Sequence, residues 1–199
     1  MRALARAFAD DPAWCWALPE RARRERVLPW FFDAALRYVA RCGEPLAAGS
    51  PVLGAALVLP PARPRLDGLQ LARVGLWQMA LRAGPRGFHR FRIQGRVLDA
   101  RHDADVARRH YYVWMIGVDP AHQRRGVGRA LLRAVAARAN AARVPTYLDT
   151  TNAGNLAFYA AAGFDVVHAG RFPGGGCDYW TLVRSVREAA ASDAVGSSE

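Results

Sequence analysis

The chain has 199 residues, 52% of them hydrophobic, and this length favours a single domain around one core. It contains no apolar run long enough to cross a membrane, and its first residues lack the apolar segment of a signal peptide, so we expect a cytoplasmic protein with no membrane partner. The three cysteines, Cys15, Cys42 and Cys177, are odd in number and far apart, which argues against a disulfide framework and a zinc site. We expect no bound metal.

The formal net charge of +11 raises the question of a nucleic-acid partner, because basic patches attract phosphates. All 28 basic residues are arginine, and they are spread along the chain among apolar residues. This distribution is more typical of a compositional bias than of a surface selected for phosphate binding. We therefore do not expect a nucleic-acid partner.

The first half of the chain predicts helices followed by one strand. Apolar residues recur at helical spacing over residues 4–12 and 29–41, which predicts two N-terminal helices. "PVLGAALVLPP" (51–61) is a short apolar run closed by two prolines and predicts one strand. From 63 to 109, helical periodicity around Leu69 and Leu76 predicts a helical insertion.

The second half predicts the element order β-α-β-α-β-β. The aromatic and β-branched run "YYVWMIGV" predicts a strand over 111–118. The elements that follow are a helix over 126–142, a strand over 146–150, a helix over 154–163, and strands over 164–170 and 178–184. We expect one domain over 1–185 and a disordered tail over 186–199, whose residues are small and polar.

"HQRRGVGRALL" (122–132) joins the strand to the start of a helix. The first turn of a helix presents unpaired backbone N–H groups and the positive end of the helix dipole, so it binds anions. Gly126 and Gly128 allow close approach of a pyrophosphate, and Arg124 and Arg125 can add charged hydrogen bonds. A P-loop needs a lysine, which this chain lacks, and a dinucleotide fingerprint needs a third glycine where Leu131 stands. A tight turn with solvated arginines is the structural alternative.

Two motifs give a resemblance to a known family. "VDPAHQRRGVGRALL" (118–132) resembles the acetyl-coenzyme A loop of the GNAT N-acetyltransferase superfamily, and "NAGNLAFYAAAGF" (152–164) resembles the motif that follows it. Together with "AFADDPAWCWALPE" (7–20), they are most similar to the puromycin N-acetyltransferase-like members. The resemblance implies an α/β GNAT acyltransferase fold, with a central mixed sheet of six to seven strands flanked by helices. The chain opens inside what is usually the first helix, so the strand that precedes this helix in the family is either absent or missing from the sequence.

The resemblance also implies site residues and acetyl-coenzyme A as the co-substrate. The edge of the strand over Met115, Ile116, Gly117 and Val118 binds the pantetheine arm, beside a bulge that splays it from the next strand. The predicted coenzyme contacts from the loop and the following helix are Gln123, Arg124, Arg125, Gly126, Val127, Gly128, Arg129, Ala130, Asn152, Asn155 and Phe158. Tyr159 stands near the coenzyme sulfur, four residues after Asn155 and on the same helix face.

The implied chemistry is direct attack of a neutral amine on the thioester carbonyl, without an acyl-enzyme. The Val118 N–H polarises the carbonyl and Tyr159 protonates the departing sulfur as a general acid. A tyrosine packed against the sheet is the structural alternative. Asp149 is a candidate base, although puromycin-type relatives commonly carry glutamate there; a structural carboxylate and proton removal through a water chain stay open.

Three functions stay open. The first is an N-acetyltransferase acting on a primary amine of a small, antibiotic-like or metabolite-like molecule. The second is an acetyltransferase acting on a macromolecule, such as a protein N-terminus or aminoacylated RNA, and the third is a non-enzymatic coenzyme A-binding module. Trp14, Trp16, Trp30 and Tyr112 are candidates for an aromatic acceptor pocket or for core, and a homodimer stays open. The charge of +11 argues against a polycationic aminoglycoside.

Overall fold

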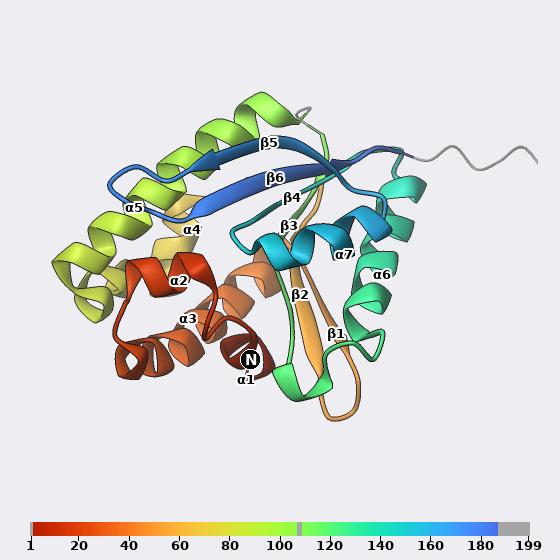
Figure 1. Ribbon diagram of the computed structural model, residues 1–199. Coiled ribbons are helices and arrows are strands. Elements are labelled where there is room, and N and C mark those ends of the chain that lie inside the picture. Colours follow the sequence, from red (N-terminus) through yellow and green to blue (C-terminus); the bar gives the residue numbers. More distant parts are fainter. Residues whose placement is uncertain (1, 107–108, 187–199) are drawn as a thin grey trace, which may run out of the picture.

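A computed structural model describes residues 2–106 and 109–186 (Figure 1). Its helices are α1 (Arg2–Ala7), α2 (Pro12–Ala17), α3 (Arg21–Cys42), α4 (Gly68–Arg73), α5 (Met79–Asp105), α6 (Val127–Ala141) and α7 (Leu156–Ala161), with short 3₁₀ turns η1 (Leu76–Gln78), η2 (Pro120–His122) and η3 (Ala153–Asn155). Its strands are β1 (Glu44–Ala48), β2 (Gly54–Leu59), β3 (Tyr111–Val118), β4 (Thr146–Thr150), β5 (Asp165–Arg171) and β6 (Asp178–Arg184). Across these described ranges, every helix is too short or too polar to span a bilayer.

The six strands form one mixed sheet in the order β1-β2-β3-β4-β6-β5. All neighbours are antiparallel except β3 and β4, which are parallel. Pairing between β3 and β4 ends at Val113 and Leu148, and the β2–β3 register shifts next to it, which leaves Trp114 as the extra residue of a bulge. Beyond this point β3 and β4 diverge, so the predicted splay beside a bulge is confirmed.

Helices cover both faces of the sheet (Figure 1). On β2, Ala55, Leu57 and Leu59 pack into one apolar cluster with α1, α2, α3 and α5, while Ala56 and Val58 pack into a second with α6 and α7. Because the side chains of a strand alternate between faces, β2 is buried on both sides and lies at the centre of the two-layered core. The mixed α/β class and six-stranded GNAT-type sheet that we predicted are both present.

The elements of the second half lie where the sequence predicts them, and the insertion between 63 and 109 is helical, with a kink at Gly84 before Pro85. The N-terminal third differs from the prediction. It holds three helices rather than two, because Asp11 caps the additional helix α2, and the helix predicted over 29–41 begins earlier, at Arg21, and continues through Pro29. It also holds β1, which pairs with β2 as a hairpin, where we predicted one strand. The predicted disordered tail lies almost wholly outside the described residues.

Candidate active site

The loop before α6 has the backbone of an anion-binding turn. Gly126 is the N-cap residue of α6 and has a φ of 83°, a left-handed conformation that glycine adopts without strain. The Ala130 N–H already donates to the Gly126 carbonyl at 2.9 Å, so it is not free to bind a ligand. The N–H groups from Gly126 to Arg129 precede the first intrahelical bond and are the donors left for one.

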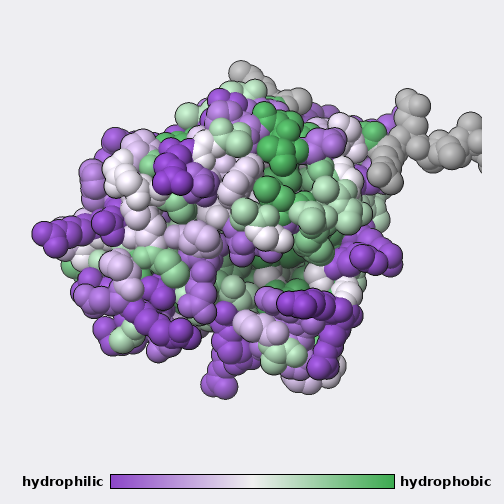
Figure 2. All heavy atoms as spheres, viewed as in Figure 1, coloured by the Kyte–Doolittle hydropathy of each residue, from purple (hydrophilic) through white to green (hydrophobic). Residues whose placement is uncertain are grey.

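A cleft of about 690 Å³ runs in front of this turn. Figure 2 shows a hollow on this face, bordered by strongly hydrophilic side chains. Of the predicted coenzyme residues, those that line the cleft are Ile116, Gly117, Val118, Gln123, Arg124, Gly126, Gly128, Arg129, Asn152, Asn155 and Phe158. The structure does not place Met115, Arg125, Val127 or Ala130 on its wall, and it adds Arg6, whose Nε donates to Asp119 at 2.8 Å.

Gly128 has a packing role that the sequence did not reveal. A Cβ at this position would lie 3.1 Å from Cζ of the Phe158 ring, which comes from α7 on the opposite wall of the cleft. The Val127 side chain packs toward β2 instead, where a Cβ at Gly54 would lie 3.0 Å from Val127 Cγ1. The first turn of α6 therefore sits close to both β2 and α7 only because glycine occupies 54 and 128.

The peptide groups along one edge of β3 face the cleft. Asp119 donates its N–H to the Leu53 carbonyl at 2.8 Å, on the β2 side. Successive peptide groups of an extended strand point to opposite sides, so the Val118 N–H and C=O point into the gap between β3 and β4. The Gln123 side chain donates to this Val118 carbonyl at 3.3 Å, which agrees with that direction.

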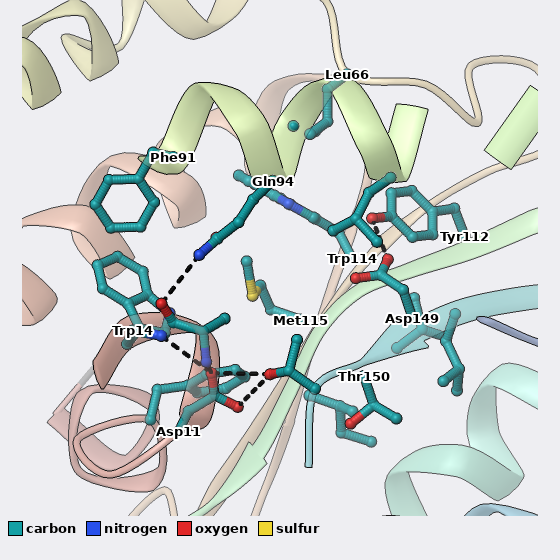
Figure 3. A pocket seen from close by; sticks show the side chains of 18 of the residues that line it. Asp11, Trp14, Leu66, Phe91, Gln94, Tyr112, Trp114, Met115, Asp149 and Thr150 are labelled. Carbon is teal, nitrogen blue, oxygen red and sulfur yellow. Dashed lines mark hydrogen bonds between the residues drawn. The ribbon is translucent and has the colours of Figure 1, made fainter. Parts of the chain in front are cut away.

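A second cavity, of about 260 Å³, lies on the other side of the splayed strands (Figure 3). Many of its lining residues are aromatic, and its walls come from α2, α3, α5, α7, β3 and β4 and from the loops beside them. The aromatic lining residues are Phe8, Trp14, Phe31, Phe91, Tyr112, Trp114, Tyr159 and Phe172. Of the tryptophans we considered for an acceptor pocket, Trp14 lines the cavity, whereas Trp16 stacks on Phe172 and Trp30 lies under the Arg82 guanidinium.

The cleft and the cavity share Phe8, Asp11, Ile116, Asn155 and Tyr159 on their walls. Tyr159 is 5% exposed, and within the described ranges its hydroxyl has no hydrogen-bond partner. Burial, followed by the nearby Asp149 and Asp11 carboxylates, raises the pKa of Tyr159, so the phenol keeps its proton. A protonated phenol therefore stands where the two hollows meet.

The comparisons with known proteins agree with this geometry. Residues 67–164 match the sequence profile of the acetyltransferase (GNAT) family. The chain carries a GNAT acetyltransferase domain. It is 41% identical over 76 residues to the N-alpha-acetyltransferase RimI of Mycobacterium tuberculosis, a match that covers 37% of this chain and 48% of that protein. The chain thus spans about half the length of the curated relative it matches.

Solved structures show the GNAT fold over nearly the whole chain. A Corynebacterium glutamicum structure described as histone acetyltransferase HPA2 and related acetyltransferase has a TM-score of 0.60 and 18% identity, covering 95% of this chain and 90% of that one. The polyamine N-acetyltransferase of Drosophila melanogaster has a TM-score of 0.55 and 17% identity, covering 92% and 91%. At these identities the likeness shows the fold and says nothing of the substrate.

Asp149 of this GNAT domain points into the aromatic cavity from β4. The Tyr112 hydroxyl donates to its Oδ2 at 2.8 Å (Figure 3). Burial raises the pKa of Asp149 to about 6, with a further increase from Asp11 and Asp99 and an opposing effect of the Tyr112 hydrogen bond. A carboxylate of this pKa is ionised near neutral pH and can still accept a proton.

Asp11 is a site residue that sequence reasoning missed. It caps α2, where its Oδ1 accepts from the Ala13 N–H at 3.0 Å, and it also accepts from the Thr151 hydroxyl at 3.2 Å. Burial raises its pKa. The signal was present as an N-cap aspartate before Pro12, but a cap alone predicts a helix start and not a place between two cavities.

Proposed function

We propose that the protein is an N-acetyltransferase that transfers the acetyl group of acetyl-coenzyme A to a primary amine of a small molecule. The observation that carries this proposal is the junction at Tyr159. There the anion-binding cleft and the aromatic cavity open onto one buried, protonated phenol. Two substrates bound one in each hollow would meet at this point.

The cleft fits coenzyme A by its chemistry. Gly126 has nothing within 4 Å of where its Cβ would be, so the open side of the turn admits a diphosphate to the free N–H groups. Arg6, Arg124 and Arg129 line the same cleft and can pair with phosphate charge. The peptide groups of Ile116 and Val118, which share one side of β3, are placed to bind an extended amide chain as an added strand would.

Acetyl-coenzyme A would supply an activated acyl group with a thiol as the leaving group. The Val118 N–H is placed to stabilise the oxygen of the attacked carbonyl, and Tyr159 to protonate the sulfur as the C–S bond breaks. Asp149 accepts the proton that the amine loses on forming the C–N bond, directly or through water. Cysteine and serine are absent from the described walls of both hollows, and the Thr151 hydroxyl there donates to Asp11, which favours direct attack over an acyl-enzyme.

The size of the cavity favours a small, metabolite-like acceptor. Its 260 Å³ lies below the volume of about 300–1,000 Å³ that is typical of drug-sized ligands. A nucleoside antibiotic of the puromycin type would need the walls from α2 and α5 to move apart. The second candidate is a protein N-terminus, which the likeness to the N-alpha-acetyltransferase RimI favours.

An amine panel that reports free thiol tests the proposal. It should hold aliphatic monoamines and diamines, aromatic amines, puromycin and a peptide with a free N-terminus, with product mass as a second readout. We expect thiol release with at least one small amine and an acetylated product. Coenzyme A binding by calorimetry without thiol release on any member would instead support a binding module, and release only with the peptide would support the macromolecular alternative.

A further inference from the structure

The charge inside the aromatic cavity is opposite to that of the whole chain. The charged side chains on its described walls are Asp11, Asp99 and Asp149, and none is basic. The chain as a whole carries 28 arginines and a net charge of +11. The wall is therefore selectively acidic in a protein in which arginine is common.

The cavity is arranged to receive a polar ligand. The Tyr159 side chain is 95% buried, opens into the cavity, and has no hydrogen-bond partner for its hydroxyl within residues 2–106 and 109–186. Asp99 likewise forms no ion pair within those ranges. The opposing charge that acts on Asp99 is Arg65, which is itself paired with Asp103. Asp99 is an exposed residue at the rim of the cavity, and the partial burial of its carboxyl together with the neighbouring Asp103 raises its pKa.

The three carboxylates differ in their relation to Tyr159: Asp11 and Asp149 act on it directly, whereas Asp99 acts on Asp149. Asp11 lines both hollows, and Asp11 and Asp149 are the charges that act on Tyr159, so they belong to the reacting end. Figure 3 shows them on opposite sides of the cavity. Asp99 lines the cavity alone, from α5, where it stands among residues that do not border the cleft.

We propose that the acceptor is a short linear amine with a second cationic group, and that Asp99 binds this second cation. This inference rests on the proposed function and names its substrate class. The reacting amine lies at Tyr159 between Asp11 and Asp149 and loses its proton there. The aliphatic chain packs along the aromatic wall, where Trp14, Phe91 and Trp114 contribute apolar surface and ring faces that attract cations. The distal cation stays charged and pairs with Asp99.

The test compares an α,ω-diamine, the amino alcohol of the same chain length, and the corresponding monoamine as acceptors for the full chain. The amino alcohol keeps the length and polarity of the diamine and removes only its distal charge. We expect kcat/KM for the diamine to exceed that for the amino alcohol by about tenfold, the scale of one hydrogen bond to a charged group. Asp99→Asn should abolish most of this ratio through a higher KM for the diamine, with little change for the amino alcohol.

Asp33→Asn is the matched control, because it removes the same charge as Asp99→Asn. Asp33 is exposed on α3 and lies outside both hollows. It should leave the ratio unchanged. Equal use of the diamine and the amino alcohol by the parent protein, or equal loss in both aspartate variants, would overturn the inference while leaving the transferase function standing. Thiol release with no member of the panel would overturn the proposed function itself.

Discussion

The two hollows that meet at Tyr159 are built in different ways. The anion-binding cleft is formed mainly by two short, continuous stretches, the end of β3 with the first turn of α6, and η3 with α7, with residues 6–11 on a third side. The aromatic cavity takes its walls from helices α2, α3, α5 and α7, from β3 and β4 and from the loops beside them, so its residues range from Phe8 to Phe172. A ligand that every member of a fold must bind can be recognised by a continuous motif. A ligand that varies is recognised by side chains gathered from distant elements, which no single stretch reveals.

The charged residues that line the cleft and the cavity also differ. The cleft is lined by Arg6, Arg124 and Arg129 together with Asp10 and Asp11, while the charged residues of the cavity wall are all aspartates. The net charge of +11 argued against polycationic acceptors, but the field that an acceptor meets is that of the cavity wall. Net charge describes long-range attraction and is a poor guide to one small site.

The largest expected effect comes from the group that both hollows share. Tyr159→Phe keeps the ring and its packing but removes the proton, so kcat should fall by roughly 10²–10⁴-fold with little change in coenzyme A affinity. The loss should shrink with an acyl donor whose thiol is more acidic, because that leaving group needs the proton less. Tyr111→Phe is the control, since the Tyr111 hydroxyl contacts Glu44 at the other end of β3. A kcat within a few-fold of the parent would assign Tyr159 a structural role.

The second-largest expected effect concerns Asp149, on the wall of the aromatic cavity. Asp149→Asn keeps an acceptor for the Tyr112 hydroxyl and removes the base, so kcat/KM should fall by about 10²-fold. In the parent protein kcat/KM should decline as the pH falls below about 6, where Asp149 becomes protonated, and this limb should be absent in the variant. A pH profile that the substitution leaves unchanged would favour proton removal by water.

The same variant should be more stable than the parent above pH 6. The pKa of Asp149 rises from its ordinary 3.8 to about 6 on folding, so the folded state binds more protons between these values. The free energy of unfolding therefore falls as the pH rises through this window. Asp149→Asn does not ionise, so its Tm should exceed that of the parent at pH 8 and approach it at pH 4. A lower Tm at pH 8 would show that the ionised carboxylate stabilises the fold.

On the cleft side, Gly126→Ala should weaken coenzyme A binding by about tenfold or more, because it strains the turn and places a methyl group on the open side. Gly174→Ala is the matched control. Gly174 also has a left-handed φ, of 72°, and a Cβ there would have nothing within 4 Å, but Gly174 lies outside both hollows. Calorimetry should show normal coenzyme affinity for Gly174→Ala at a similar loss of Tm. Equal affinity in both variants would remove the loop from the coenzyme site.

The smallest effect separates two neighbouring arginines. Arg124 lines the cleft and Arg125 does not, although the sequence treats them alike. Arg124→Ala should weaken coenzyme A binding by about fivefold, the upper range for an exposed ion pair, and Arg125→Ala by less than about twofold. Raising the salt concentration should reduce the difference, since both side chains are exposed. The reverse order of losses would place the phosphates on the other side of the loop.

Local signals made the second half of the fold predictable. The strand over Tyr111–Val118 carries aromatic and β-branched residues, and glycines or prolines mark the ends of its neighbours. β1 was missed because "EPLAA" is poor in strand-forming residues and is held by its pairing with β2. The start of α3 was missed because residues 21–26 are almost all charged and Pro29 suggested a boundary, whereas the buried face around Phe32 stabilises the helix through it.

The residues of the site, like the elements of the fold, were predictable from the sequence only where a local signal marks them. Tyr159, Asp149 and most of the predicted coenzyme residues follow from the motifs and the resemblance, and the structure gathers them on the walls of the two hollows. Asp11 and Asp99 could not be predicted, because their position depends on how α2 and α5 pack over the sheet. The role of Gly128 was only half visible, since its contact with the Phe158 ring joins two elements that are 30 residues apart in the chain.

The initial-velocity pattern with both substrates varied tests most directly the claim that the two hollows meet for direct transfer. The acetyl donor and the best amine of the panel would be varied against each other, and thiol release would be followed in the first turnover without amine. The account predicts intersecting double-reciprocal lines and no stoichiometric thiol release until an amine is added. Parallel lines with a burst of one thiol per protein in the absence of amine would reveal an acyl-enzyme and contradict it.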